Sequence, residues 1–476
     1  DIIGKVQNAV WGWPLIILIL AAGVWLTVRT GFVQVLHLGK ALKFMVKNED
    51  NGEGEVTSFG ALCTALSATI GTGNIVGVAT AICLGGPGAL LWMLLAAFFG
   101  MATKYSEGFL AIKYREQKDD RHYLGGPFYY IEKGMGSKWK WLAKLFAVFG
   151  ICVGLFGIGT FTQINGIATA VQDFFDPESA HVAFTLFGND YTWATVIGGL
   201  VVTLCVALVV LGGIQRIAKV SQVIVPFMAI TYVVFALVIV LGHITAIPAA
   251  VKLICQSAFD PQAALGAATG VTIKLAMQKG IGRGIFSNEA GLGSAPIAAA
   301  AAKTKDTVRQ GLVTMTGTFI DTIVICTLTG LSIVVTGAQN AFVAGSVEGV
   351  KITSRAWQTG LPWNGRFSAF VLMVCLAFFA FTTILGWNYY SERCLEYLVG
   401  SQKFTKVYRY LYILAVFIGP YLTVAAVWNI ADICNGLMAF PNLVALFALS
   451  GVVGKETRAY FAEKRHDLKA LAQDKK

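Results

Sequence analysis

Long apolar stretches follow one another along almost the whole chain, and no other feature limits the possible folds so strongly. A membrane-crossing helix needs about 20 mostly apolar residues, and about 11 such stretches can be marked, the last two barely separated. Hydrophobic residues make up 56% of the 476 and charged residues only 13%, about half the charged share of a soluble domain. The sequence therefore predicts an all-α polytopic membrane protein with about 11 transmembrane helices. We expect these spans at 10–29, 57–83, 87–113, 142–172, 192–213, 217–242, 263–302, 311–336, 366–396, 408–424 and 426–453.

The rest of the composition argues against several other classes of protein. The net charge of +11 comes from residues in short loops between apolar stretches, whereas a nucleic-acid binder gathers its Lys and Arg on one soluble face. The nine cysteines form no C-x-x-C pairs, and the five histidines lie at or beyond the ends of spans, so neither a disulfide framework nor a transition-metal site is expected. An intramembrane enzyme would need a nucleophile with a base, or a metal cluster, and a channel would need rings of charge or filter loops. We therefore expect neither an enzyme nor a channel, and no nucleic-acid partner.

The basic residues also predict an orientation in the membrane. When the predicted loops are assigned to alternating sides, most of the 37 Lys and Arg fall on one side, which is the cytoplasmic side of most membrane proteins. This bias places the N-terminus outside and the tail at 454–476 in the cytoplasm. It also places the amphipathic segment 28–46 and the basic loop 113–145 in the cytoplasm, for a multi-pass protein of the cell membrane.

Two of the predicted spans contain a G-x-G pattern beside small polar residues. Gly71 and Gly73 interrupt the second span, and Gly291 and Gly293 interrupt the seventh. Glycine costs up to about 1 kcal/mol in a helix interior, so each pair predicts a local unwinding, which is tolerated in a membrane only where the backbone lines a cavity or is buried in protein. An unwound segment offers free amides to a carboxylate and free carbonyl groups to a cation. The alternative is that these glycines only permit close helix packing.

The two interrupted spans lie five spans apart, so the units 57–242 and 263–453 would enter the membrane in opposite orientations. Gly-interrupted segments at matching positions of two inverted repeats mark the binding site of secondary transporters. We therefore expect residues 1–476 to form one transporter domain, in which 10–29 is an extra helix before a core of two inverted repeats.

Three segments carry a resemblance to a known family: SATIGTGNIVGV at 67–78, GIFSNEAGLGSAPIAAAAA at 284–302 and TTILGWNYYSER at 382–393. They closely resemble the alanine or glycine:cation symporter family, the sodium:alanine symporters. The resemblance implies a leucine-transporter-like fold with a five-plus-five inverted core. It also implies sodium-coupled symport of a small neutral amino acid, alanine or glycine, into the cell by alternating access. Besides membrane lipids, the expected partners are that amino acid and Na⁺ as the coupling ion, with no other cofactor.

The same resemblance implies a substrate site at the two interruptions. The amides around Gly71, Thr72 and Gly73 would bind the carboxylate of the amino acid, and carbonyl groups near Phe286 and Ala290 would meet its ammonium group. Gln163 is the expected side-chain partner, although an isolated Gln inside a membrane commonly bonds two helices together. Trp387, beside Phe286, would leave room in the pocket for little more than a methyl group, unless it only packs the core.

Two sodium sites are implied as well, because hydroxyl, carboxylate and carbonyl oxygens suit a hard cation. The first would use the Thr69 carbonyl, the Asn74 side chain, the Ser287 hydroxyl and Asp321, and the second would join the carbonyls of Ser67 and Ile70 to Thr382 and Thr383. The alternative for the Thr pair is hydrogen bonding to its own helix.

Acidic side chains within spans are candidates for functional groups by default. Besides Asp321, the sequence places Glu107 and Glu289 inside spans. Glu289 could pair with Arg283 or take part in ion coupling, and Glu107 lies beside Lys104, as in a structural ion pair. If Glu289 or Asp321 carries a proton, the alternative function is proton-coupled or exchange transport on the same fold.

Overall fold

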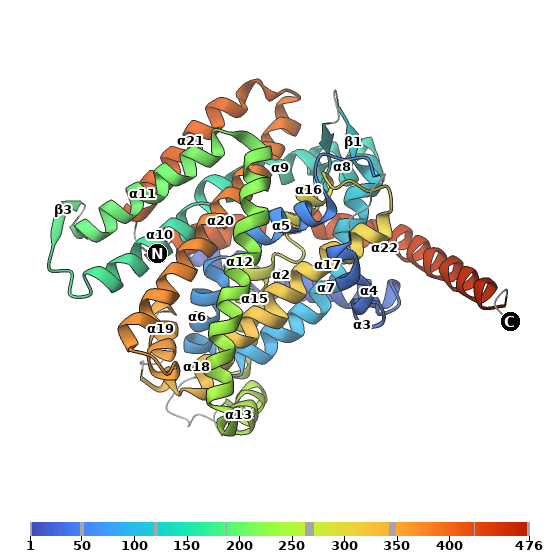
Figure 1. The fold of residues 1–476 in the computed structure, drawn as a ribbon. Helices are drawn as coiled ribbons and strands as arrows, with labels where there is room; N and C mark the ends of the chain where they lie inside the picture. The colour runs from blue at the N-terminus through green and yellow to red at the C-terminus, as the bar shows by residue number, and fades with distance from the viewer. Residues whose placement is uncertain are drawn as a thin grey trace.

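A computed structural model describes residues 2–47, 52–118, 122–186, 188–261, 271–341, 349–422 and 424–473. The described chain is almost entirely helical (Figure 1). Its strands form two short antiparallel hairpins, β1 (Glu116–Gln117) with β2 (Tyr123–Leu124) and β3 (Val182–Leu186) with β4 (Asn189–Thr192). The structure therefore confirms an all-α membrane protein.

Within the described ranges, 7 helices are long and apolar enough to cross a membrane, or up to 8 if the bent pair Ser58–Thr69 and Gly73–Gly85 is one span. Two shorter apolar helices are α2 (Trp13–Arg29) and the pair η5 and α13 (Ile244–Phe259). The predicted total of about 11 spans and the inverted repeats stay predictions. The longer spans are α7 (Ala89–Tyr114), α9 (Lys140–Phe156) with α10 (Phe161–Phe175), α11 (Trp193–Val210), α12 (Gly213–Gly242), α17 (Thr307–Thr318) with η7 (Phe319–Cys326) and α18 (Thr327–Val335), α20 (Gly365–Val399) and most of α22 (Val424–Gln473).

Two boundaries differ from the expected spans. The stretch predicted at 142–172 contains two helices, α9 and α10, because the chain leaves the helical path between Gly157 and Thr160. Gly157 and Gly159 both donate to the Val153 carbonyl, at 3.0 and 3.2 Å, which closes a tight turn. The seventh stretch was predicted from 263, but 262–270 lie outside the described residues and α15 begins at Ile273.

The helices divide into a buried core and a lipid-facing shell. In the centre, α7 packs against α15 (Ile273–Asn288), α17 and α2, and α20 packs against α9, α10, α12 and α5 (Ser58–Thr69). The outer helices α11 and α12 are only 28% and 33% buried over their most apolar segments. They expose large apolar side chains, which is unfavourable in water and expected in lipid; examples are Ile197, Leu204, Leu208, Val223 and Ile230.

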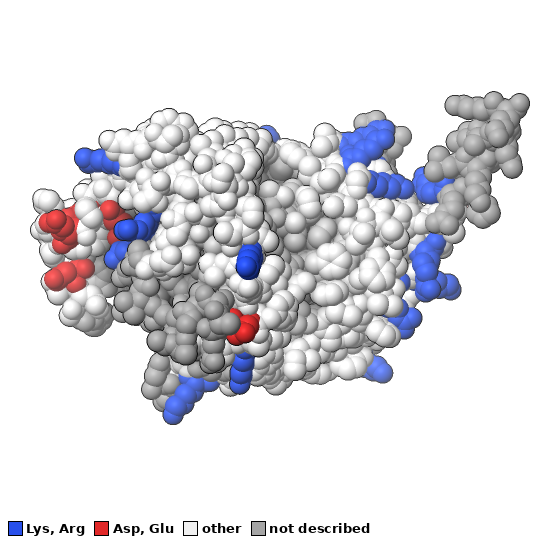
Figure 2. Space-filling view, turned by 90° about the horizontal axis from the view of Figure 1, so that it is seen from below, with Lys and Arg blue, Asp and Glu red and all other residues white. Residues whose placement is uncertain are grey.

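The two ends of the bundle carry different elements. One end, here called the hairpin end, carries β3, β4 and α19 (Gly349–Gly360). The other, here called the basic end, carries α3 (Val33–Leu36), α4 (Leu38–Val46), β1, β2 and the projecting C-terminal part of α22 (Figure 1). Figure 2 shows acidic side chains together with Lys and Arg in its left half and, among the charged side chains drawn, only Lys and Arg along its right margin, with a broad uncharged surface between. This distribution matches a bundle that crosses a membrane.

Candidate functional site

The first predicted interruption is present. Helix α5 ends at Thr69, the chain turns at Ile70–Thr72, and η1 (Gly73–Gly77) continues directly into α6 (Val78–Gly85). The helix Gly73–Gly85 is bent by 52° relative to α5. Two amides freed by this break are taken by side chains. The Gly71 amide donates to Asn74 Oδ1 at 2.9 Å, and the Thr72 amide donates to Gln163 Oε1 on α10 at 3.0 Å. The break is therefore a group of backbone donors that side chains can release to a ligand.

Both glycines of this break are needed for close approach. A Cβ atom at Gly71 would lie 2.5 Å from Thr383 Oγ1 and 2.9 Å from Gln163 Oε1, and one at Gly73 would lie 3.0 Å from the Ser287 Cα. The break in the second span thus touches α10, α15 and α20 at once. Unwinding and close packing, which the sequence leaves as alternatives, occur together here.

The second predicted interruption is also present. Helix α15 ends at Asn288, α16 (Ala295–Ala299) begins a few residues later, and positive φ angles occur between them at Glu289 (57°), Gly291 (90°) and Gly293 (81°). Only glycine adopts such angles without strain. Glu107 on α7 holds this break: its Oε1 accepts from the Gly291 amide at 3.1 Å and from Asn442 Nδ2 at 2.8 Å.

A buried cluster around Asp321 joins the two breaks. Asn74 Nδ2 donates to Asp321 Oδ1 at 2.7 Å, and Ser287 and Thr322 donate their hydroxyls to Oδ2 at 2.9 and 2.7 Å. All four side chains are fully buried. Three predicted ion-site residues from three helices are thereby brought together, whereas the Thr69 hydroxyl bonds to Ala65 in its own helix at 3.2 Å. Sequence reasoning missed Thr322, although it adjoins an intramembrane acid.

The predicted second ion site is brought together in part. The Thr383 hydroxyl donates to the Ile70 carbonyl at 3.2 Å, across from α20 to the first break, and also to Phe379 in its own helix at 3.0 Å. The neighbouring Thr382 hydroxyl bonds to Phe379 and to Met228 Sδ on α12 at 3.5 Å. Because its side chain points to α12, Thr382 does not meet Ile70. The Ser67 hydroxyl bonds to the Thr64 carbonyl at 2.7 Å.

The predicted substrate residues lie around the same two breaks. Gln163 bridges α10 to the first break, and its Nε2 is anchored on the Ile158 carbonyl at 3.0 Å. Phe286 is buried near the end of α15, with the Arg283 guanidinium 5.5 Å from its ring, and the Ala290 amide donates to Asn288 at 2.9 Å. Trp387 reaches from α20 to the second break, where its indole N–H donates to Glu289 Oε1 at 2.8 Å.

One expectation for a charged partner is corrected. Glu289 does not pair with Arg283: its carboxylate accepts from Trp387 and Ser294, while Arg283 pairs with Asp432 on α22 at 3.3 Å. The reason is that Glu289 lies just outside α15 in a left-handed conformation and does not continue the helix that carries Arg283. Glu107 lies within electrostatic reach of Lys104, as expected, and its carboxylate also holds the second break.

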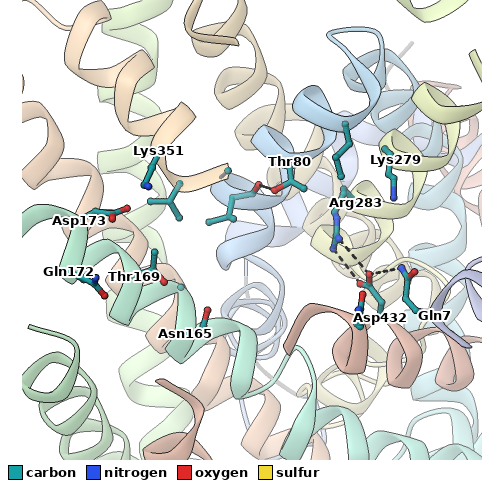
Figure 3. Close-up of a pocket in the computed structure, with 16 residues that line it drawn as sticks. Gln7, Thr80, Asn165, Thr169, Gln172, Asp173, Lys279, Arg283, Lys351 and Asp432 are labelled. Carbon is teal, nitrogen blue, oxygen red and sulfur yellow. Dashed lines mark hydrogen bonds and ion pairs between the residues drawn. The ribbon is translucent and has the colours of Figure 1, made fainter. Parts of the chain in front are cut away.

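A cavity of about 550 Å³ opens beside the first break toward the hairpin end. Asp432 lies at its wall and is joined to Arg283 and, at 3.0 Å, to Gln7 of α1 (Ile2–Val10) (Figure 3). Lys279, Thr80 and Lys351 face the same space. Sequence reasoning overlooked Asp432, although an acid within a predicted span is the same signal that identified Asp321.

The basic end is closed by backbone and side-chain contacts. Val56 pairs with Ala302 as an isolated bridge, which ties the segment before α5 to the segment after α16. Arg115 crosses this seam and donates to four carbonyl oxygens at 2.7 to 2.9 Å, those of Glu53, Ala300, Ala302 and Thr304. The described residues thus close this seam at the basic end, where a separate cavity of about 790 Å³ lies beside it, lined in part by His122 and Glu396, whereas the cavity of about 550 Å³ opens toward the hairpin end.

A charged cluster reinforces this seal. Arg393 on α20 binds Glu55 at 3.1 Å and Glu396 at 3.1 Å, and His122 lies 3.2 Å from Glu55 and 2.9 Å from Glu396. Burial lowers the pKa of His122, but the hydrogen bonds of Glu396 and Glu55 outweigh it and raise that pKa above its usual value. Burial raises the pKa of Glu55, but His122 and Arg393 outweigh it, so that pKa is lowered. The cluster is therefore held by opposite charges near neutral pH.

Comparison with known proteins agrees with this architecture. The profile of the sodium:alanine symporter family matches residues 1–474. An uncharacterized transporter of Haemophilus influenzae is 53% identical over 97% of this chain and 96% of its own. The sodium/alanine symporter AgcS of Methanococcus maripaludis is 45% identical over 98% of this chain and 99% of its own.

A solved structure shows the same fold despite low sequence identity. The crystal structure of MhsT in complex with L-phenylalanine matches with a TM-score of 0.57 at 11% identity, over 86% of this chain and 99% of that chain. That fold is the leucine-transporter-like fold expected above, and the family is one of transporters, not of enzymes. From its two broken helices and its match across residues 1–474, the chain belongs to the sodium:alanine symporter family.

Proposed function

We propose that this protein couples the entry of Na⁺ to the uptake of a small neutral amino acid, alanine or glycine, by alternating access. The observation that carries the proposal is the buried contact between the two breaks: Asn74 from the first and Ser287 from the end of α15 meet on one carboxylate, that of Asp321. Backbone groups of the first break, which side chains now occupy, and ligand oxygens for a cation therefore lie side by side, as coupled binding of two solutes requires. The 45% identical symporter from Methanococcus maripaludis supports the same assignment.

The Asp321 cluster supplies the oxygens for the first proposed sodium site. The Asp321 carboxylate and the hydroxyls of Ser287 and Thr322 are ligand types that a hard cation prefers. Asn74 faces this carboxylate with its Nδ2, so its amide oxygen would join these ligands only after the amide group turns over. Asn74 also accepts from the Gly71 amide. Ion binding at Asp321 would thereby adjust the backbone of the first break, and this link would couple the ion to the amino acid. The Thr69 carbonyl is proposed as a further ligand.

The second proposed sodium site lies between α5 and α20. The Ile70 carbonyl and the Thr383 hydroxyl already face each other at 3.2 Å, and the Ser67 carbonyl is the proposed third oxygen. Thr382 would have to turn from α12 toward α5 to complete the site.

The proposed amino-acid site uses the amides of Gly71, Thr72 and Gly73 for the carboxylate. Gln163 Oε1 now accepts a hydrogen bond from the Thr72 amide. When the amino acid binds, Gln163 would release this amide to the carboxylate of the ligand, and its own side chain would turn toward the ligand. Carbonyl groups near Phe286 and Ala290 would accept from the ammonium group. Two large aromatic side chains, Phe286 and Trp387, would then leave room for little more than a methyl group.

The cavity beside the first break and the closed seam at the basic end support an outward-facing state. In the proposed orientation the N-terminus and the hairpin end are outside, and the basic end and the C-terminus are cytoplasmic, as the basic bias predicts. The cavity of about 550 Å³ then faces outside, while the Val56–Ala302 bridge and Arg115 close the inner side. Release into the cell would require these inner contacts to separate.

Uptake by purified protein in proteoliposomes tests the proposal. Labelled alanine and glycine would be offered with an inward sodium gradient, an inward proton gradient, or neither. We expect accumulation of both amino acids only with the sodium gradient. Uptake that follows the proton gradient and ignores sodium would instead support the proton-coupled alternative, with Glu289 or Asp321 as the proton carrier.

A further inference from the structure

The indole of Trp387 is held at its nitrogen by one buried carboxylate. Its Nε1 donates to Glu289 Oε1 at 2.8 Å, and the other carboxylate oxygen, Oε2, accepts from the Ser294 hydroxyl. All three side chains are at most 1% exposed. Both oxygens of Glu289 are therefore engaged by side chains within the protein.

Glu289 occupies an unusual place in the backbone. It caps α15 with a left-handed φ of 57°, whereas Ser294 caps α16 on the other side of the same break. A residue other than Gly adopts such a φ only where the surrounding structure holds its backbone in that conformation. The carboxylate thus ties together the end of one half-helix, the start of the next, and α20.

The base of Trp387 is fixed as tightly as its tip. A Cβ atom on Gly159, in the turn between α9 and α10, would lie 2.7 Å from the Trp387 Cβ, so the Trp387 backbone lies directly against this turn. The Tyr412 hydroxyl lies 2.8 Å from the Gly159 carbonyl and 2.7 Å from the Ile384 carbonyl, and its single proton is shared between these two acceptors. The base of Trp387 thus packs against a braced turn, while Glu289 is the hydrogen-bond acceptor for its indole nitrogen.

Side chains of α20 contact both breaks. Thr383 lies one helical turn before Trp387 and contacts the Ile70 carbonyl at the first break. Trp387 contacts Glu289 at the second. Two side chains one turn apart on α20 therefore connect this helix to the two breaks.

We propose that Glu289 is a positioning residue that holds Trp387 as a fixed wall, and that this hydrogen bond sets the size limit for the side chain of the transported amino acid. The inference rests on the proposed function and adds to it a determinant of specificity. The selected ligands are α-amino acids whose side chain is no larger than a methyl group. Glu289 acts through Trp387 and needs an acceptor oxygen for this, not a negative charge.

Three variants test this role in proteoliposomes with an imposed sodium gradient. Glu289→Ala removes the acceptor, Glu289→Gln keeps one acceptor oxygen, and Trp387→Phe removes the donor but keeps a ring. The measured quantity is the ratio of kcat/KM for alanine to that for 2-aminobutyrate, which is one methylene longer. Such a methylene is discriminated about 10-fold or more in a tight pocket.

We expect Glu289→Ala and Trp387→Phe each to lower this ratio about 10-fold, through a lower KM for 2-aminobutyrate. Glu289→Gln should retain most of the selectivity. The double variant Glu289→Ala with Trp387→Phe should be no less selective than either single variant, because both break one interaction. Glu392→Ala, which removes another buried carboxylate of α20 paired with Arg409, should leave the ratio unchanged.

Two results would overturn the inference. One is an unchanged ratio in Trp387→Phe, a variant that keeps the packing and is informative even if Glu289→Ala fails to fold. The other is an equal loss of sodium-driven accumulation in Glu289→Gln and Glu289→Ala, which would assign Glu289 to ion or proton coupling. A wild-type protein without sodium-dependent alanine uptake would instead refute the proposed function, so the two failures are distinguishable.

Discussion

At the scale of single residues, Asn74 links the first break to the buried acid. Its Oδ1 accepts from the Gly71 amide at 2.9 Å and its Nδ2 donates to Asp321 Oδ1 at 2.7 Å. One side chain thus contacts the backbone proposed for the amino acid and the carboxylate proposed for sodium. Such a shared partner is a physical means by which one ligand changes the affinity for the other.

Asn74→Ala is expected to weaken the sodium dependence of alanine uptake. The variant removes a proposed ligand oxygen and a hydrogen bond to a buried carboxylate, a change of about 1.5 kcal/mol, so the sodium concentration for half-maximal uptake should rise about 10-fold. The measurement is the initial uptake rate as a function of sodium concentration. Asn364→Ala, which removes a cap of α20 far from the site, is the control. An unchanged sodium response would remove Asn74 from the ion site.

At the scale of elements, the break between α5 and η1 depends on how closely other helices approach it. Gly71 lies so close to Thr383 and Gln163 that a methyl group does not fit, whereas a Cβ atom at Gly77, in η1 of the same span, meets nothing within 4 Å. The two glycines belong to the same predicted span but have opposite surroundings. Substitutions at these two positions therefore distinguish an effect on the packing of the break from an effect on the stability of the helix.

Gly71→Ala is expected to lower alanine uptake at least about 10-fold, because overpacking of about 1–3 kcal/mol pushes α10 or α20 away from the break. Gly77→Ala should keep uptake and gain up to about 1 kcal/mol of helix stability. Alanine uptake and thermal unfolding of both purified variants are the measurements. Equal uptake by the two variants would show that close packing at Gly71 is not required for transport.

At the scale of the whole molecule, the seal at the basic end depends on charge. We compare the closed seal with an opened seal in which each group has its ordinary pKa. The raised pKa of His122 then stabilises the closed form fully below about pH 6.5. This stabilisation is lost as the pH rises through the raised pKa of His122. The lowered pKa of Glu55 stabilises the closed form above its usual value of about 4.3, and this is lost as pH falls through the lowered pKa. The seal is therefore most stable between these two limits.

Hydrogen exchange of the seam at 53–57 and 300–304 tests this pH dependence. After correction for intrinsic rates, we expect exchange in the wild-type protein to accelerate above the pKa of His122. In His122→Gln the acceleration should disappear. His181→Gln, at the hairpin end, is the control, since the exposed His181 contacts only the nearby Asp176 among the ion pairs of the described residues. A pH profile that His122→Gln leaves unchanged would assign the seal to Arg393 and Arg115 alone.

Much of the fold could be predicted because membrane spans and helix breaks depend on short local stretches of sequence. Apolar length identifies helices such as α7 and α20, and G-x-G beside polar residues located both breaks. The same pattern at Gly157–Gly159, which ends α9, was overlooked inside a long apolar stretch. Local backbone preference is a property of a few neighbouring residues, so it is readable without knowledge of the other helices.

The sequence by itself determined the class of protein, the positions of the two breaks and the family to which the chain belongs. Only the tertiary structure decided which side chains meet: Thr383 but not Thr382 reaches Ile70, and Glu289 binds Trp387 while Arg283 binds Asp432. These contacts depend on the rotation of each helix about its axis and on its height against its neighbours. Both are set by the packing of the whole bundle, because a rotation of about 100° per residue turns adjacent side chains toward different helices.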